Sequence, residues 1–188
     1  MAETLPYPIE IHEGVGQQDR EDLLAIENPY FASRKVLRYW LERANTLFLV
    51  ARGIPPAELP LVGPDDLWGP ELAKPVNRIA MARAHTVGLL WCALGRTGGN
   101  RTRCEVKDVI GHVDMPEDPL LTAFLQRLKH LRHERDWAFL EANLGDNEDL
   151  TTVFTQQGFE PVSSIPQYDL VKFAWPARSW RRLSEDAN

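Results

Sequence analysis

Four polar residues in two strand-like stretches of the sequence are of types that can transfer protons or hold a substrate. Asp108 and His112 belong to one stretch, and Glu141 and Asn143 to another. Side chains alternate between the faces of a strand, so Glu141 and Asn143 share one face, and Asp108 and His112 share another. Carboxylate and imidazole groups can act as general bases. A structurally paired polar group at a strand edge is the alternative interpretation for each.

Other reactive side chains lack the spacing that a metal or nucleophile site needs. Cys92 and Cys104 are the two cysteines, and they form no CxxC pair, which excludes a disulfide framework and an all-cysteine zinc site. The histidines form no HExxH motif. The turn 95–100 lacks the GxxxxGK[ST] pattern of a phosphate loop. His130 and His133 lie among basic residues, where a solvated helix face competes with a phosphate-contacting patch.

Composition limits the classes of protein to which this chain can belong. With 188 residues, of which 44% are hydrophobic, it can bury the core of one domain. Its 21 basic and 27 acidic residues give a net charge of −6, which argues against a general nucleic-acid binder. No leader-like segment and no run of about 18 apolar residues is present, so we expect a cytoplasmic protein that is not inserted in a membrane.

Hydrophobic periodicity predicts an α/β (α+β) fold with the order β-α-α-β-β-β-α-β-α-β-β and helices on both faces of the sheet. Asp19 is the predicted N-cap of the first helix, and Gly158 is predicted to end the last helix in the left-handed conformation. The predicted strands are 9–12, 46–51, 85–94, 103–110, 137–144, 159–162 and 168–173, and the predicted helices are 19–26, 36–41, 119–135 and 147–157.

Two further segments stand apart from these elements. Residues 53–75 contain six of the fourteen prolines and form either a surface insertion or a lid in which Trp68 covers a site. Residues 176–188 form a short basic tail. The aromatic residues of the first two helices are predicted to pack in the core or to border an acceptor site; they are Tyr30, Phe31, Tyr39 and Trp40.

The residues at 147–159 carry a resemblance to a known family. Asn147 is followed by Leu150, by Phe154 and then by Gly158 and Phe159. This spacing, together with the order of the elements, resembles the GNAT (GCN5-related N-acetyltransferase) family, in which Leu150 replaces a usually small residue. The similarity of organisation covers most of the chain, whereas the motif covers about its last third.

The resemblance implies one domain over residues 1–188 with a mixed central sheet of about seven strands. It implies an N-acyltransferase that moves an acyl group, acetyl in the first instance, from a CoA thioester to an amine on a small molecule or a protein. Glu141 is then the preferred base, with His112 or Asp108 as alternatives. A homodimer is left open. The residues that the resemblance places at the cofactor are Val113, Leu120, Leu121, Asn147 and Phe154.

Two departures from the family pattern leave alternatives open. The turn 113–119 contains three carboxylates and two prolines where the family has a glycine- and arginine-rich pyrophosphate loop. Phe154 stands where many members have a tyrosine that protonates the leaving thiolate, and phenylalanine has no proton to donate. The alternatives are a catalytically inactive scaffold that binds a partner and a transferase that uses a different acyl donor.

Overall fold

The computed structural model describes most of the chain. Its helices and strands lie before residue 54 and after residue 83. The Pro-rich insertion that follows Gly53 lies outside the described residues, as do Trp68, Tyr30, Phe31 and Trp40. Of the second predicted helix, residues 36, 37 and 40 also lie outside them, whereas 38, 39 and 41 are helical. The described residues are 4–25, 38–39, 41–43, 45–53, 84–98, 100–111 and 115–185.

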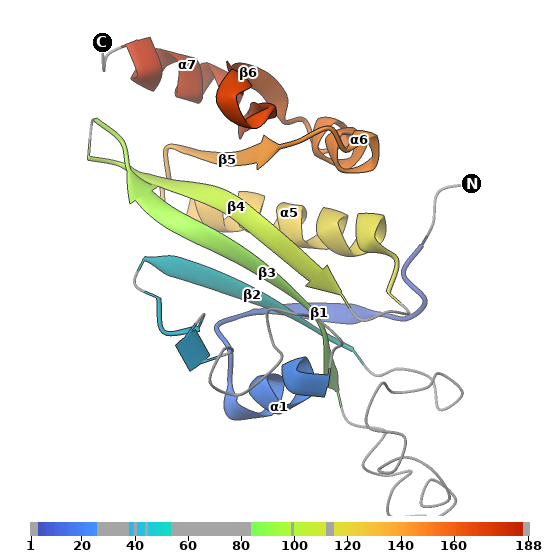
Figure 1. Ribbon diagram of the computed structural model, residues 1–188. Coiled ribbons are helices and arrows are strands. Elements are labelled where there is room, and N and C mark those ends of the chain that lie inside the picture. Colours follow the sequence, from blue (N-terminus) through green and yellow to red (C-terminus); the bar gives the residue numbers. More distant parts are fainter. Residues whose placement is uncertain are drawn as a thin grey trace, which may run out of the picture. The chain divides into compact units, whose positions relative to one another are not determined.

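The strands form one mixed sheet with the order β1-β2-β3-β4-β5-β7-β6 (Figure 1). The predicted α/β fold class is therefore confirmed. Every predicted strand is present, and most differ from their predicted bounds by only a few residues. The elements are β1 Ile9–Glu13, α1 Gln17–Ala25, β2 Thr46–Gly53, β3 His85–Arg96, β4 Thr102–Gly111, α5 Glu117–Glu134, β5 Phe139–Leu144, α6 Glu148–Gln156, β6 Glu160–Ile165, β7 Leu170–Trp175 and α7 Ala177–Glu185, with a 3-10 turn at Pro166–Tyr168.

The contacts divide the chain into two compact units. The first unit contains β1, α1 and most of β2, together with the first residues of β3. In this unit β1 pairs antiparallel with β2, from Ile9↔Gly53 to Glu13↔Leu49, and Figure 1 shows them as neighbouring blue and cyan strands. Its buried nonpolar side chains include Leu23 of α1 and Leu49, Val50 and Ala51 of β2.

The second unit is built around β5, which has a parallel neighbour on one side and an antiparallel neighbour on the other. It pairs parallel with β4 and antiparallel with β7, and β6 pairs with β7. Parallel neighbours require a crossover connection, and α5 supplies it between β4 and β5. The parallel register covers four residue pairs and ends at Val106↔Ala142.

The helix α5 packs through one apolar face. Its side chains at i, i+3, i+4 and i+7 spacing are completely or almost completely buried, as the sequence predicts. At the N-terminus of α5, the carboxylates of Glu117 and Asp118 lie in the first turn, where they interact favourably with the helix dipole. The buried residues are Leu121, Phe124, Leu125, Leu128 and Leu131.

The C-terminus of α6 forms a Schellman motif. Gly158 has a φ of 74°, its N–H donates to the carbonyl of Thr155, and the N–H of Phe159 donates to the carbonyl of Phe154. The rings of Phe154 and Phe159 lie edge to face with centroids 5.1 Å apart. The predicted left-handed end of this helix at Gly158 is confirmed.

One local prediction was wrong. The first helix begins at Gln17, so Asp19 lies inside its first turn instead of at the N-cap. Its carboxylate still accepts a hydrogen bond from the N–H of Gly16, which is the reciprocal half of a capping box. The basic tail predicted at residues 176–188 contains the helix α7. None of the described helices has the length and apolar composition that a membrane span requires.

We predict that Gly158→Ala destabilises the protein by about 1 kcal/mol, because an L-residue with a side chain disfavours the left-handed conformation. Gly145→Ala is the matched control, since its added Cβ would make an ordinary 3.6 Å contact with Leu170. Urea unfolding of both variants measures the difference. Equal midpoints for the two variants would show that the left-handed conformation at Gly158 contributes nothing.

Candidate active site

Strand register gathers polar side chains on one face of the second unit. Glu105 and Glu141 are Cα partners across β4 and β5, and Asn143 and Lys172 are partners across β5 and β7. Partners point to the same face, and so do residues two positions apart. We call this surface the polar sheet face, and its members are Arg103, Glu105, Lys107, Glu141, Asn143 and Lys172.

At the centre of the polar sheet face, Glu141 is fully buried. Its Oε1 accepts a hydrogen bond from Arg103 Nη1 at 2.5 Å, and its Oε2 lies 3.3 Å from Lys172 Nζ. The second contact is an ion pair without hydrogen-bond geometry. Burial of an unpaired carboxylate is costly, and the two cations on either side of Glu141 offset this cost.

A glycine leaves room for the side chain of Arg103. A Cβ added at Gly95 would lie 2.9 Å from Arg103 Nε, closer than nonbonded atoms approach. Arg103 Nε therefore lies close to the backbone of β3 at Gly95, while Arg103 Nη1 contacts Glu141 of β5. Gly95 thus has a packing role in this unit.

Glu105 and Asn143 form a second polar pair on the same face. Glu105 Oε1 accepts hydrogen bonds from Lys107 Nζ at 2.6 Å and from Asn143 Nδ2 at 2.8 Å. Its Oε2 has no hydrogen-bond partner among the described residues. The Oδ1 atom of Asn143 is buried and also accepts no hydrogen bond. Since buried amide oxygens are normally hydrogen-bonded, Asn143 Oδ1 is a candidate acceptor for a ligand N–H.

The structure brings together some of the residues proposed from the sequence and separates others. Glu141 and Asn143 share a face, as strand alternation predicts. By the same alternation Asp108 points to the opposite face from Glu141, and His112 lies outside the described residues. Arg103 and Lys172 were not predicted from the sequence. The signal available was the alternating charge of β4, Arg103-Glu105-Lys107, which marks a polar strand face.

The residues predicted at the cofactor lie mainly in the core. Leu120, Leu121 and Phe154 are each at most 2% exposed. Leu120 fills the space beside Gly88 and Gly111, where an added Cβ would lie 2.8 and 2.9 Å from its Cδ2 atom. Val113 lies outside the described residues.

Asn147 lies at the rim of a pocket of about 490 Å³ at the start of α6. Its Oδ1 accepts a hydrogen bond from the N–H of Leu150 at 3.0 Å, so its side chain caps the helix. The pocket also contains the side chains of Asp146, Glu148 and Asp169. Its acidic lining is suited to cations and unfavourable for a pyrophosphate.

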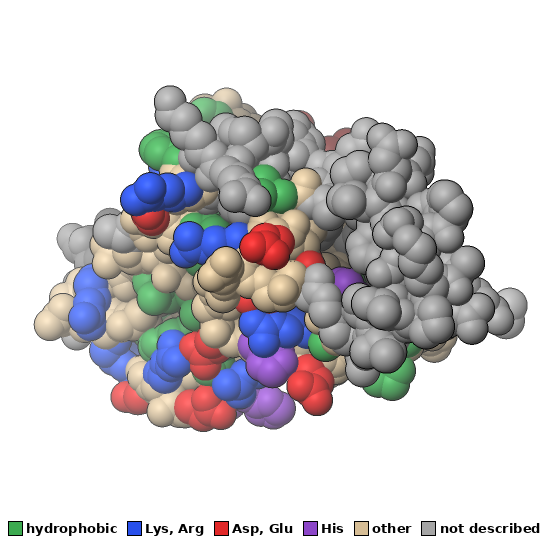
Figure 2. All heavy atoms as spheres, turned by 90° about the horizontal axis from the view of Figure 1, so that it is seen from below, with side chains coloured by type: hydrophobic (Ala, Val, Ile, Leu, Met, Phe, Trp, Pro, Cys, Tyr) green, Lys and Arg blue, Asp and Glu red, His purple; other side chains and the backbone are tan. Residues whose placement is uncertain are grey.

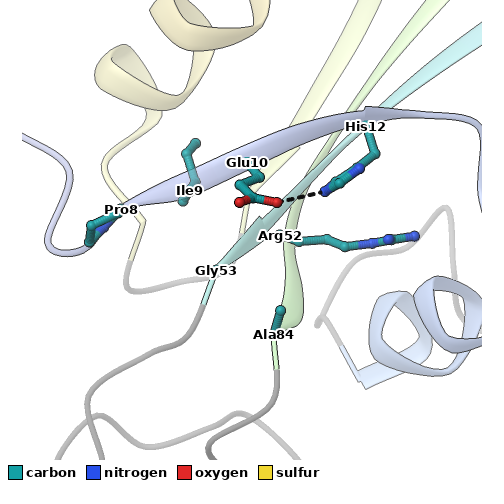
Figure 3. A pocket seen from close by; sticks show the side chains of 7 residues that line it. All are labelled: Pro8, Ile9, Glu10, His12, Arg52, Gly53 and Ala84. Atoms are coloured by element: carbon teal, nitrogen blue, oxygen red, sulfur yellow. Dashed lines mark ion pairs between the residues drawn. The ribbon is translucent and has the colours of Figure 1, made fainter.

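A second pocket, of about 460 Å³, lies in the first unit beside β1 and β2 (Figure 3). Glu10 and His12 of β1 point toward one another and form an ion pair of 3.4 Å, and Arg52 of β2 lies next to them. Figure 3 shows the Arg52 side chain extending toward α1. Its guanidinium forms an ion pair with a carboxylate of that helix.

That carboxylate is Asp19, which is 1% exposed and saturated with donors. Arg52 donates to both of its oxygens, at 2.7 and 2.5 Å, and Thr86 Oγ1 donates at 2.7 Å. Burial raises the pKa of Asp19, but hydrogen bonds from Arg52, Thr86 and Gly16 outweigh burial and hold the pKa below 3.8. Asp19 therefore ties α1 to β2 and β3 as a structural anion.

Near Asp19, Asp22 and His85 continue this buried network. Asp22 Oδ2 accepts a hydrogen bond from the N–H of Thr86 at 3.0 Å, and Asp22 Oδ1 lies 3.7 Å from His85 Nδ1. His85 is 7% exposed, and its Nε2 has no hydrogen-bond partner among the described residues.

The two cysteines are free and buried. Burial raises the pKa of the Cys92 thiol, and the neighbouring Cys104 raises it further. A thiol that stays protonated is a poor nucleophile, so Cys92 is suited to packing. In the part of the chain that the structure describes, no three His, Cys, Asp or Glu side chains are grouped so that they could hold a metal ion.

Charge is mixed on the face of the molecule drawn in Figure 2. Lys and Arg side chains alternate there with Asp and Glu, and no continuous basic surface forms among the described residues of this face. Such a surface is the usual mark of a nucleic-acid binder.

No protein-family model and no curated protein matches the sequence. Solved structures do match. The ribosomal-protein-alanine N-acetyltransferase of Brucella melitensis biovar Abortus 2308 has a TM-score of 0.56 at 14% identity, over 84% of this chain and 96% of that chain. The GNAT domain of S. lividans PAT has a TM-score of 0.54 at 14% identity, over 88% and 89%.

A chain of the NatC complex bound to Gag peptide and CoA has a TM-score of 0.53 at 11% identity, over 88% of this chain and 96% of that chain. These similarities show that the protein has the GNAT fold, as the sequence predicts. Identities of this size establish the fold and leave activity and substrate to be argued from the site.

We predict that Arg52→Gln lowers the free energy of unfolding by about 3 kcal/mol, because it leaves the Asp19 charge buried without its cation. Glu10→Gln is the control, since the Glu10 side chain is 83% exposed and its ion pair with His12 lies at the surface. Chemical denaturation at pH 7 measures both. Equal losses would mean that the Asp19–Arg52 pair contributes no more than a surface pair.

The Asp19 pair also predicts a pH dependence. The pKa of Asp19 in the folded protein is below 3.8, so its contribution to stability is complete above the unfolded-state pKa and is lost as the pH falls through the folded-state value. Asp19→Asn should therefore cost stability at pH 7 and progressively less as the pH falls below 3.8. A constant difference between the two proteins across that range would contradict this assignment.

Proposed function

We propose that this protein is an N-acyltransferase that moves an acyl group, acetyl in the simplest case, from a CoA thioester to an amine. The observation that carries the proposal is the end of the parallel register at Val106↔Ala142. Beyond that pair β4 continues through Lys107 and Asp108, and β5 through Asn143 and Leu144. Backbone groups that are not paired across these strands can hydrogen-bond the amides of an extended acyl-pantetheine arm.

The side chains next to this point suit amine acylation. The amine must lose a proton to attack the thioester carbonyl. Glu105 Oε2 has no hydrogen-bond partner among the described residues, whereas both oxygens of Glu141 face cations. We therefore assign the base to Glu105 and keep Glu141, which the sequence favours, as the alternative. The NatC structure, which carries CoA, supports an acyl-CoA donor for proteins of this fold.

A second candidate is a GNAT scaffold that binds a partner without turnover. Phe154 is 2% exposed and packs on Phe159, so it supplies no acid for the leaving thiolate. Glu117 and Asp118 place negative charge in the first turn of α5. A thiolate with a pKa of about 8.5 can leave without strong acid help, so the first candidate is retained as the proposal.

Acetyl-CoA should raise the melting temperature of the protein. At 100 times Kd a ligand stabilises the folded state by about 2.7 kcal/mol. Each kcal/mol corresponds to about 2–4 °C for a domain of this size. Differential scanning fluorimetry measures the shift, with ATP as a control for general polyphosphate binding. An unchanged melting temperature at millimolar acetyl-CoA would favour the scaffold or a different donor.

The choice of base is tested by Glu105→Gln, which should lower kcat for amine acetylation about 10²- to 10⁴-fold. The melting temperature should change little, because the amide keeps a hydrogen-bond acceptor for Asn143 and Lys107. Glu141→Gln is the companion variant and should mainly reduce stability. Normal turnover in Glu105→Gln, together with loss of turnover in a folded Glu141→Gln protein, would transfer the role to Glu141.

A further inference from the structure

The charges of the polar sheet face do not balance. Arg103, Lys107 and Lys172 supply three cations, whereas Glu105 and Glu141 supply two carboxylates. Lys107 is paired with Glu105, so the excess positive charge lies with Arg103 and Lys172 around Glu141. This excess positive charge would not attract a simple amine acceptor, but it would attract an acceptor that also carries an anionic group.

Arg103 and Lys172 are held in place yet remain partly open to solvent. Their side chains are 38% and 19% exposed, and the carboxylate that anchors them is fully buried. Arg103 lies in the space beside Gly95 and uses Nη1 for Glu141, so other guanidinium N–H groups remain for a ligand. The ammonium of Lys172 makes no well-aligned hydrogen bond to Glu141. Two oriented cations of this kind fit a carboxylate.

Asn143 lies directly beside Lys172. Whereas Lys172 can donate hydrogen bonds to a ligand, Asn143 can accept one. The two residues are Cα partners, and paired side chains in antiparallel strands have Cβ atoms about 5 Å apart. Asn143 Oδ1 is buried and needs a donor. Its orientation is fixed because Glu105 accepts from Nδ2, and a carboxylate cannot donate to an amide oxygen. An amine N–H would satisfy this oxygen.

We propose that the acceptor is a free amino acid or a similar small amine that carries a carboxylate a few bonds from its nitrogen. The carboxylate binds Arg103 and Lys172, and the amine lies at Asn143 Oδ1 and Glu105. This assignment rests on the proposed acyltransferase function. A peptide N-terminus, whose α-carboxyl group is an amide, lacks the group that the two cations select.

The reaction balances with these groups. Glu105 takes a proton from the acceptor ammonium, and the nitrogen lone pair attacks the thioester carbonyl. The new C–N bond forms as the C–S bond breaks, and the thiolate leaves with the bonding electron pair. The nitrogen then loses its second proton, which reaches the thiolate by way of solvent, and Glu105 releases the first proton to solvent. The products are the N-acyl amino acid and free CoA.

The test compares free L-amino acids that have apolar, polar and acidic side chains with the corresponding amino-acid amides. Saturation-transfer NMR without any donor measures binding, and acetyl-CoA assays measure KM and kcat. We expect the amino acids to bind about 10-fold or more tightly than the amides. Lys172→Gln should remove this preference by raising KM for amino acids and leaving KM for amides unchanged.

We call Arg103 and Lys172 the carboxylate clamp. Two further variants separate loss of carboxylate binding by this clamp from misfolding. Gly95→Ala should displace Arg103 without touching the reacting atoms, and it should raise KM for amino acids. Its melting temperature should fall somewhat, because Arg103 also pairs with the buried Glu141, so KM is measured well below that temperature. Arg181→Gln removes an exposed arginine that is paired with Glu160 outside the polar sheet face, and it should change neither constant.

The outcomes distinguish this inference from the proposed function. If acetyl-CoA binds and amides or peptides are acetylated as well as amino acids, the function stands and the carboxylate clamp is wrong. If acetyl-CoA does not bind but amino acids bind through Lys172, the clamp stands and the acyl-CoA donor is wrong. Absence of amino-acid binding, with or without acetyl-CoA, overturns the clamp.

Discussion

The arrangement of the second unit depends on the buried charge of Glu141. A carboxylate without solvent must have cations close to it, and these come from the two strands that flank β5. Arg103 reaches it from β4 and Lys172 from β7. The same interaction that ties three strands together therefore also determines which charges the polar sheet face presents. Stability and the chemistry of the face have one physical origin here.

The parallel pairing of β4 and β5 adds a second constraint. Because parallel strands need a crossover, α5 must lie between them in sequence and pack its apolar side chains under the sheet. The register then ends while both strands continue. Backbone groups that are not paired between these strands occur at the point where Glu105 and Asn143 stand, which places hydrogen-bonding capacity for a ligand next to candidate catalytic groups.

The number of hydrogen bonds separates structural polar groups from candidate functional ones. Asp19 receives donors from Arg52, Thr86 and Gly16 on its two oxygens, so little acceptor capacity remains and its role is to hold α1. The Nδ2 atom of Asn143 donates a hydrogen bond to Glu105, whereas its Oδ1 atom is buried and has no hydrogen-bond partner among the described residues. Both sites contain buried side-chain oxygen atoms. What differs is whether the protein itself completes the hydrogen bonding.

Much of this protein could be predicted from local sequence. Hydrophobic periodicity placed the strands and α5, the Asn147–Phe159 motif placed α6 and its glycine cap, and strand alternation put Glu141 and Asn143 on one face. Each of these depends on residues a few positions apart, and the backbone geometry of single helices and strands is sufficient to determine them.

The partners of the buried charges could not be predicted in this way. Arg103 and Glu141 are 38 residues apart, and Arg52 and Asp19 are 33 residues apart. Which residues face one another across β4, β5 and β7 depends on register, and a shift by one position would move every side chain to the other face. The sequence alone therefore determined the elements and a candidate carboxylate. Only the tertiary structure decided that Glu141 is clamped by two cations and that Glu105 and Asn143 keep free acceptor atoms, because these follow from contacts between strands.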